Sequence, residues 1–422
     1  MKAIVRRSAA VVTFVGLLGL TLTAPQRQHV ERFADLLVVA PRRKTLAQLA
    51  ALELDAVDPS NLADFFRISP WVSDDLALAL LRFVFDYLHE RHRGLPPTPL
   101  YLSIDDSLAI KDKGTRKLQG VDWHFDHNQH RAVRGSNHVV LRLHWGDYHF
   151  PLSWRLYLRQ STVRRLNRQR PTNRLRYRSK LALTQQMLQQ VQSRLPKENP
   201  IYVLFDSWYT SAKLVKWIRQ RGWHVIAAVK SNRTVSGKKL TAWHKGLKGH
   251  SYDRVSLEQA NGQKRTYWVR SIWGKLRRVP GTVRVHLSQQ GPGVHTPKYF
   301  LSTDRTLSSQ EVLRRYQIRW SQEVDFWYVK EQLGLADYRL QSYEAIEKWY
   351  TVVYLVLVYL YWRRYEERQL GRKPASLSEV MARIRLEHQR DVLRSACEEA
   401  ARGTPLEQVL KRYLVEPRPK AA

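Results

Sequence analysis

Four polar residues that could bind phosphate or a metal ion lie within one short stretch of the chain. Tyr316, Arg319, Glu323 and Lys330 are separated by three, four and seven positions. On a helix of about 3.6 residues per turn, these offsets place all four side chains on one face. Arginine and lysine bind phosphate, and a carboxylate beside them can hold a hard divalent cation. The stretch therefore predicts a helix face that handles phosphate and metal together.

Further carboxylates are predicted upstream, where two strands end. Asp105 and Asp106 close an alternating segment, and Asp206 closes a nearly continuous apolar run. Magnesium prefers oxygen ligands, and a pair of divalent ions can activate the attacking oxygen and stabilise the leaving oxygen of a phosphodiester. The predicted ligands of two Mg²⁺ ions, for which Mn²⁺ can substitute, are therefore Asp105 or Asp106, Asp206 and Glu323.

The spacing Tyr-x2-Arg-x3-Glu-x6-Lys resembles the signature of the DDE transposases of bacterial insertion sequences, and the sequence fits it without a gap. The resemblance covers roughly residues 100–365. It implies that Glu323 is the third member of an Asp-Asp-Glu triad, and that the tyrosine, arginine and lysine of the signature face the DNA of the transposon end. The family motif Asp-x-Ser/Thr favours Asp105 as the first member and leaves Asp106 as the alternative.

What the resemblance implies for function is cut-and-paste DNA transposition: metal-dependent cleavage at transposon ends, followed by strand transfer into target DNA. It also implies a homodimer on DNA, because catalysis in trans is usual in this family. Two alternatives stay open, namely a ribonuclease-H-like nuclease without strand transfer and a non-catalytic DNA-binding relative.

The composition favours a nucleic-acid partner. Lysine and arginine outnumber the acids 71 to 37, and the pI is near 10.4. Such an excess suits double-stranded DNA, although a generally basic surface is the plainer interpretation. The single cysteine, Cys397, excludes a disulfide within the chain and a cysteine-based zinc site, which favours the reducing cytoplasm. Nothing in the sequence calls for a small-molecule substrate.

Two apolar stretches could be mistaken for membrane segments. Residues 8–24 follow basic residues and look like a signal peptide, but a basic chain with a phosphate-binding helix favours a buried first helix instead. Residues 350–362 are too few for a membrane span, which needs about 20 apolar residues. We therefore expect a buried core helix there and no membrane partner.

The order of predicted elements indicates an α/β fold of the ribonuclease-H-like class. Residues 96–365 are predicted to form this catalytic domain, in which residues 231–305 form an inserted antiparallel β region. A helical domain at residues 1–95 precedes it and a helical tail at residues 366–422 follows. The first domain could be a helix-turn-helix-like DNA reader or a plain helical bundle. In the first case, residues 42–44 would supply the earliest phosphate contacts.

Two further clusters could bind ligands. Between residues 155 and 180 the chain carries ten basic residues and no acid, and a segment of this kind suits contact with the DNA backbone. The candidates taken from it are Arg164, Arg165, Arg168 and Arg170. The second cluster is a run of histidines that could bind zinc, but histidines at a surface near DNA are the plainer interpretation. Its members are His124, His127 and His130, with Asp122 and Asp126 among them.

Overall fold

The computed structural model describes residues 2–41, 43–55, 58–112, 115, 117–126, 129–246, 252–259, 262–291, 297–372 and 375–414. Five helices precede the first strand: α1 (Ala9–Leu17), α2 (Ala24–Val39), α3 (Leu46–Ala50), α4 (Pro59–Arg67) and α5 (Ser73–Arg91). Three of them begin at side-chain caps. The Thr45 and Asp58 side chains accept backbone N–H groups of α3 and α4, and Thr23 forms a capping box with Gln26.

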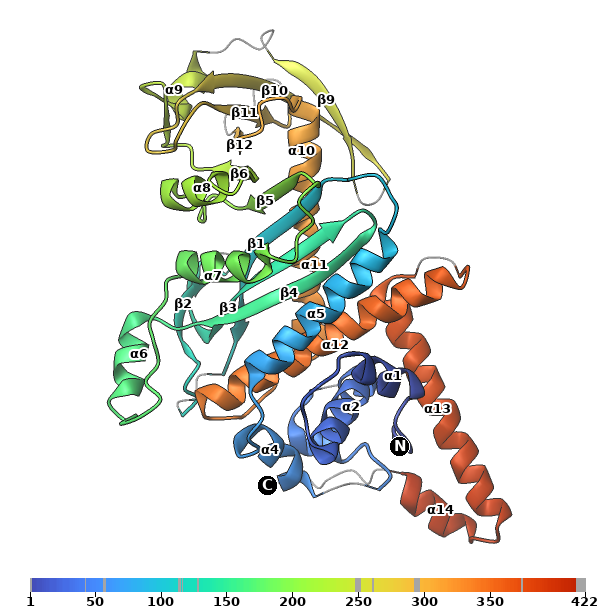
Figure 1. Ribbon diagram of the computed structural model, residues 1–422. Coiled ribbons are helices and arrows are strands. Elements are labelled where there is room, and N and C mark those ends of the chain that lie inside the picture. The colour runs from blue at the N-terminus through green and yellow to red at the C-terminus, as the bar shows by residue number, and fades with distance from the viewer. Residues whose placement is uncertain are drawn as a thin grey trace.

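A mixed sheet forms the centre of the molecule (Figure 1). Its first half contains β1 (Leu100–Ile110), β2 (Asp122–Asp126), β3 (Arg131–Trp145), β4 (Tyr148–Tyr157), β5 (Ile201–Phe205) and β6 (His224–Val229). Strands β1, β5 and β6 are parallel neighbours, whereas β3 pairs antiparallel with β1, β2 and β4. Helices connect these strands: α6 (Gln160–Asn167), α7 (Lys180–Gln192) and α8 (Ala212–Arg219).

The predicted antiparallel region continues this sheet. Strand β12 pairs with β6, and the order then runs through β11 and β10 to β9. The bounds of these strands are β9 (Asp253–Glu258), β10 (Lys264–Gly274), β11 (Val283–Gln289) and β12 (Lys298–Ser302). A small pair, β7 (Thr234–Val235) and β8 (Lys238–Lys239), and helix α9 (Leu240–Lys245) lie beside them.

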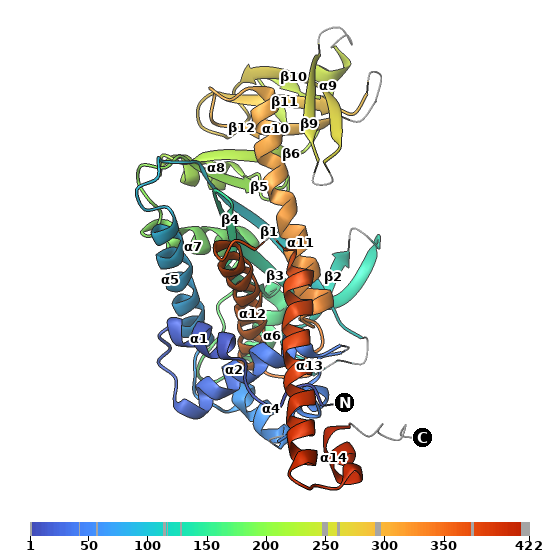
Figure 2. The same cartoon turned by 90° about the vertical axis from the view of Figure 1, so that its right-hand side faces the viewer.

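The helix expected around Tyr316 is several helical segments in line rather than one uniform α-helix. It consists of α10 (Ser309–Gln317), the 3-10 turn η2 (Ile318–Trp320), α11 (Ser321–Trp327) and the π-helical turn η3 (Tyr328–Gln332). Figure 2 shows α10 and α11 running from the β9–β12 end of the molecule past the middle of the sheet. Ser308 and Glu311 form a capping box at its start.

Three helices complete the chain: α12 (Tyr343–Gln369), α13 (Leu377–Ala401) and α14 (Leu406–Tyr413). Helix α12 contains the apolar stretch at residues 350–362 and is buried nearly all round, between the sheet and the N-terminal helices (Figure 1). Phe14 and Phe33 pack against its aromatic side chains. The helices of residues 1–95 therefore share one apolar core with α12 and the sheet. Within the described ranges, no helix is long and apolar enough to cross a membrane.

Two details correct the sequence-based expectations. Strand β1 does not end at its two acids but continues to Ile110, because β3 pairs with it as far as Gly135. Lys44, expected to contact phosphate, is 3% exposed, and its ammonium group donates to the carbonyl oxygen of Ala40 at 2.6 Å. Burial lowers its pKa to about 8. Arg43 is exposed as expected, and residue 42 lies outside the described residues.

Candidate active site

Two of the predicted acids lie side by side on neighbouring strands. The parallel pairing of β1 and β5 runs from Leu100 opposite Ile201 to Ile104 opposite Phe205. Asp105 is the next residue of β1, Asp206 directly follows the end of β5, and adjacent strands lie about 4.8 Å apart. The point where β5 ends thus brings together carboxylates that are 101 positions apart in the sequence (206 − 105).

Arg319 connects the third acid to this pair. One terminal nitrogen of its guanidinium group donates to Oδ2 of Asp105, and the other donates to Oε1 of Glu323 at 3.0 Å. The side chains of Asp105 and Arg319 are 18% and 14% exposed, whereas that of Glu323 is 39% exposed. Three predicted catalytic acids and one arginine therefore gather at one place, which is open to solvent on the Glu323 side.

The surroundings of Asp105 change the pKa of its carboxyl group. Burial raises its pKa to about 7, with smaller increases from the negative charges of Asp206 and Asp106, while Arg319 acts in the opposite direction. Arg319 lies between Asp105 and Glu323. Among the described residues, no group of three His, Cys, Asp or Glu side chains is arranged to hold a metal ion. Arg319 thus bridges the carboxylates of Asp105 and Glu323, and Asp206 lies beside Asp105.

Asp106 faces the opposite side of the sheet. It pairs with Val139 on β3, whereas Asp105 pairs with Val140, so their side chains alternate. The carboxylate of Asp106 accepts from Lys180 at 2.6 Å, Tyr209 at 2.8 Å and Asn137 at 3.0 Å. Burial alone would raise its pKa, but the positive charge of Lys180 and these hydrogen bonds hold it below its usual value. Asp106 already has a complete set of protein partners.

Buried polar groups fix α11 against the sheet. The amide of Gln322 donates to the carbonyl oxygen of Val140 at 2.9 Å, directly opposite Asp105 on the neighbouring strand. Asp325 lies 3.2 Å from Arg142 of β3, and both side chains are 1% exposed. These contacts set the position of Glu323, which is one residue from Gln322. These contacts were not predicted from the sequence. Asp325 was nevertheless a signal, because a carboxylate on the apolar side of a predicted helix indicates a buried partner.

The other two signature residues lie on either side of Arg319 along the helix. The Tyr316 ring packs on Phe300 with centroids 4.8 Å apart, and the guanidinium carbon of Arg319 lies 5.6 Å from the Tyr316 ring centre. Burial raises the pKa of Tyr316. Lys330, in η3, is half-buried, and burial lowers its pKa while the charges of Glu331 and Asp126 raise it. Tyr316 therefore belongs to the cluster around the acids, and Lys330 extends it toward β2.

The arginines predicted to contact DNA divide into two kinds. Arg164, Arg165 and Arg168 are exposed on α6 and at its end. Arg170 instead forms a bidentate pair with Glu344 at 2.5 and 3.0 Å and also donates to Gln119. Its side chain is 14% exposed. Arg170 already fastens the segment after α6 to the start of α12.

The histidine cluster does not assemble into a metal site among the described residues. Burial lowers the pKa of His124 to about 4, and its ring lies 6.3 Å from that of Tyr157. His130 is exposed, and His127 lies outside the described residues. Asp122 accepts a hydrogen bond from the Thr162 hydroxyl, which joins β2 to α6.

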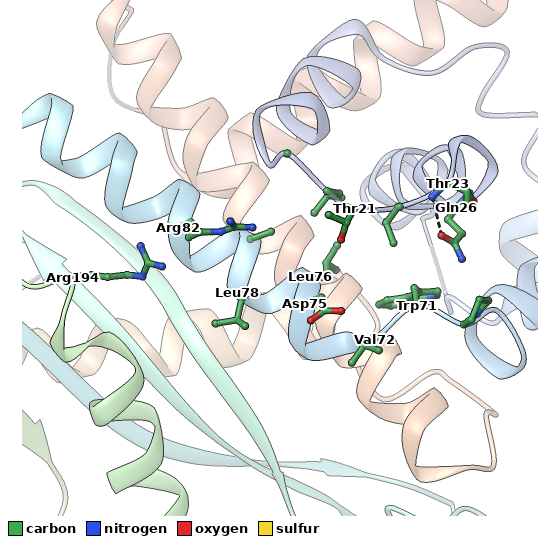
Figure 3. Close-up of a pocket in the computed structure, with 15 residues that line it drawn as sticks. Thr21, Thr23, Gln26, Trp71, Val72, Asp75, Leu76, Leu78, Arg82 and Arg194 are labelled. Atoms are coloured by element: carbon green, nitrogen blue, oxygen red, sulfur yellow. Dashed lines mark hydrogen bonds between the residues drawn. The ribbon is translucent and has the colours of Figure 1, made fainter.

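A separate pocket of about 570 Å³ opens between the segment that joins α1 to α2 and helix α5. Figure 3 shows Thr21, Trp71 and Asp75 around it, with Arg82 and Arg194 at one side. None of the predicted catalytic residues lines this pocket. This cavity is therefore separate from the acids around Arg319.

Comparison with known proteins decides the family. The sequence profile of the family described as DDE superfamily endonuclease matches residues 18–272, which is more than half of the chain. The chain belongs to the DDE superfamily endonucleases. The matched region includes Asp105 and Asp206 and ends before Glu323.

Two of the proteins that resemble this chain are a curated relative and a solved structure. A protein of Microchaete diplosiphon described as "Probable transposase for insertion sequence element IS701" is 24% identical over 326 residues, which are 76% of this chain and 77% of that one. A piggyBac transposase solved by cryo-EM in a synaptic complex with hairpin DNA aligns with 98% of this chain and 84% of its own, at 11% identity and a TM-score of 0.48.

Proposed function

We propose that this chain is a transposase that cuts DNA at the ends of a mobile element and joins those ends to target DNA. The observation that carries the proposal is the meeting of Asp105, Asp206 and Glu323 around Arg319, from strands and a helix far apart in the sequence. Membership of the DDE superfamily endonucleases and the likeness to a probable insertion-sequence transposase support it.

The proposed fold of the catalytic part is ribonuclease-H-like. The order strand, hairpin, helix, strand, helix, strand from β1 to β6 supports this assignment. We assign residues 96–365 to catalysis, with residues 231–305 as the insertion, residues 1–95 to recognition of the transposon end, and residues 366–422 to a helical tail. A homodimer on double-stranded DNA in the cytoplasm is the proposed working form.

The donor set suits divalent metal ions. Asp105, Asp206 and Glu323 offer only carboxylate oxygens, which are the ligands that Mg²⁺ and Mn²⁺ prefer. When bound there, the two ions would activate the attacking oxygen and stabilise the leaving oxygen. The protein contributes position: Gln322 and Asp325 hold α11 against the sheet, and so hold Glu323 near the ends of the strands.

The basic residues of the site orient the substrate. Arg319 and Lys330 can clamp the phosphates on either side of the scissile bond, because guanidinium and ammonium groups pair with phosphate oxygens. The Tyr316 hydroxyl, beside Arg319, can hold one of the same phosphates in place. With the phosphate held in this way, the reacting bond stays in line with the attacking oxygen, and this placement supplies a large part of such catalysis.

Asp206→Asn and Glu323→Gln are expected to bind a duplex carrying the element's end as the wild type does, and to lose metal-dependent cleavage by ~100-fold or more. Cleavage is followed with a labelled duplex in Mg²⁺ or Mn²⁺, and binding by gel shift. Glu331→Gln is the matched control, since Glu331 is an exposed glutamate on the same helix and lies outside the proposed triad.

Wild-type cleavage rates in either triad variant would falsify the assignment. A pre-cut duplex then separates the remaining possibilities. Joining of its 3′ end to a target plasmid is the result expected of a transposase, whereas cleavage without joining would indicate a nuclease. Binding without any metal-dependent nicking would indicate a relative that has lost catalysis.

A further inference from the structure

Arg319 lies between two of the proposed metal ligands. Its two terminal nitrogens donate to Asp105 and Glu323, which are two of the three proposed metal ligands. The guanidinium group also lies beside the Tyr316 ring and is largely shielded from solvent. The two carboxylates therefore already share one cation that belongs to the protein.

This resident cation and a divalent metal ion exclude each other. A carboxylate oxygen that accepts an N–H bond has less capacity for a metal, and two cations within contact distance repel strongly where water is scarce. The ion pair with Asp105 is the more shielded of the two, because Glu323 is 39% exposed. Metal binding at both carboxylates thus requires the guanidinium group to move away.

The guanidinium group of Arg319 does not use all of its hydrogen-bond donors, which makes such a movement feasible. Its Nε is buried and has no hydrogen-bond partner among the described residues. A DNA phosphate offers the guanidinium fork a bidentate partner, because its two non-bridging oxygens share one negative charge and can accept two parallel N–H bonds, whereas the fork is now divided between two separate carboxylates. A DNA phosphate beside α11 is therefore a competing partner for this side chain.

We propose that Arg319 is the resident counter-ion of the DNA-free site, and that a phosphate of bound DNA draws it away and so opens Asp105 and Glu323 to divalent metal. The inference rests on the proposed metal-dependent function and adds its regulation. DNA and metal would then bind with positive coupling, and by linkage each would raise the affinity for the other by the same factor. A chain without DNA would hold little metal and would have no active nuclease site.

The test is Mn²⁺ binding to the full-length chain, measured by electron paramagnetic resonance of free Mn²⁺, with and without a pre-cut duplex of the element's end. The wild type is expected to bind Mn²⁺ about tenfold more tightly with DNA. Arg319→Gln is expected to bind Mn²⁺ about tenfold more tightly than the wild type without DNA, and to show little further gain when DNA is added. Arg319→Lys keeps the charge but has no bidentate fork, so its DNA-free affinity for Mn²⁺ is expected to lie between those of the wild type and Arg319→Gln.

Arg315→Gln is the matched control. Arg315 lies on α10, is 11% exposed and pairs with Glu311 at 3.6 Å. Its replacement therefore removes the same charge and leaves the partners of the proposed metal ligands in place. Equal Mn²⁺ affinity of the wild type with and without DNA would overturn the proposal, and this measurement needs no variant. Equal affinity of DNA-free Arg319→Gln, Arg315→Gln and wild type would overturn it too.

These outcomes differ from a failure of the proposed function. If Mn²⁺ binds the DNA complex and Glu323→Gln abolishes that binding, the metal site stands whatever Arg319 does. If Mn²⁺ binds none of the proteins, with DNA or without it, the metal-dependent function and its regulation both fall. Thermal melting of each variant, compared with the wild type, separates a loss of binding from a loss of fold.

Discussion

At the scale of single residues, adjacent acids have opposite environments. Asp105 and Asp106 are neighbours in the sequence, but the alternation of a strand sends them to opposite faces of the sheet. Asp105 meets Arg319 on the α11 side, while Asp106 is bound by Lys180, Asn137 and Tyr209 on the α7 side. The two carboxylates therefore differ in their partners: Asp105 contacts Arg319 of the proposed site, and Asp106 is bound by three other side chains of the protein.

This difference predicts contrasting variants. Asp105→Asn should lose cleavage and keep its stability to within about 1 kcal/mol, because its pKa is already raised to about 7 by burial. Asp106→Asn should lose ~1–3 kcal/mol of unfolding free energy, because it leaves the Lys180 charge without its carboxylate. Urea denaturation and the cleavage assay together measure both effects. A stable but inactive Asp106→Asn beside an active Asp105→Asn would reverse the assignment.

At the scale of elements, the helices that position the site are held by buried polar contacts as well as by apolar packing. Asp325 of α11 pairs with Arg142 of β3, and the Tyr361 hydroxyl of α12 donates to the same carboxylate. Removing one member of such a pair leaves a buried charge without a partner. These contacts therefore favour a single position of α11 on the sheet. On α12, Glu347 accepts a hydrogen bond from Tyr343 at 2.6 Å, and burial raises the pKa of Glu347 to about 7.

Glu347 predicts a pH dependence of stability. Its folded-state pKa of about 7 lies above the ordinary value of 4.5, so the folded protein keeps a proton that the unfolded chain releases. Unfolding free energy should therefore fall as the pH rises from about 4.5 to about 7, by at most ~1.4 kcal/mol per pH unit.

Glu347→Gln removes this titration and keeps an acceptor for the Tyr343 hydroxyl. Urea denaturation of both proteins across this pH range isolates the contribution, because all other titrating groups are common to the two. The variant should gain stability relative to the wild type as the pH rises. A constant difference between the two proteins across the range would show that Glu347 is ionised in the folded state.

At the scale of the whole molecule, the chain is strongly basic and its terminal helices are part of one core. The net charge is +34. Part of it comes from the exposed arginines of α6, which lie at the β2–β3 end of the sheet. Helix α13 packs against α2. There, His388 lies 3.0 Å from Asp35, and Arg385 donates to the carbonyl oxygen of Val38. Bound DNA would therefore meet one continuous body, in which the first and last segments support α12.

The arginines around α6 predict two different responses to salt. Replacing Arg164, Arg165 and Arg168 with glutamine should weaken DNA binding and reduce the slope of log affinity against log salt by about 1 for each DNA phosphate that is no longer neutralised. Arg170→Gln should leave that slope nearly unchanged and lower thermal stability, because Arg170 is paired with Glu344. Fluorescence anisotropy between roughly 50 and 200 mM salt measures the slope. An equal slope change in both variants would place Arg170 on the DNA.

Much of the local structure followed from the sequence alone. The Ser308–Glu311 cap, the buried strand Ile201–Phe205 and the common helix face of Arg319 and Glu323 depend on hydrophobic periodicity and on hydrogen bonds between residues close in the chain. Such patterns are readable because their causes lie within a few residues. The apolar run at 350–362 was likewise enough to predict a buried helix.

Only the tertiary structure decided which distant groups meet. Sequence spacing could not place Arg319 on Asp105, 214 positions away, or pair Arg142 with Asp325. It also could not show that β1 continues past its acids, because that depends on the length of the pairing with β3. Strand register and the burial of charge are set by contacts between remote segments, and a local pattern holds no information about which remote partner satisfies it.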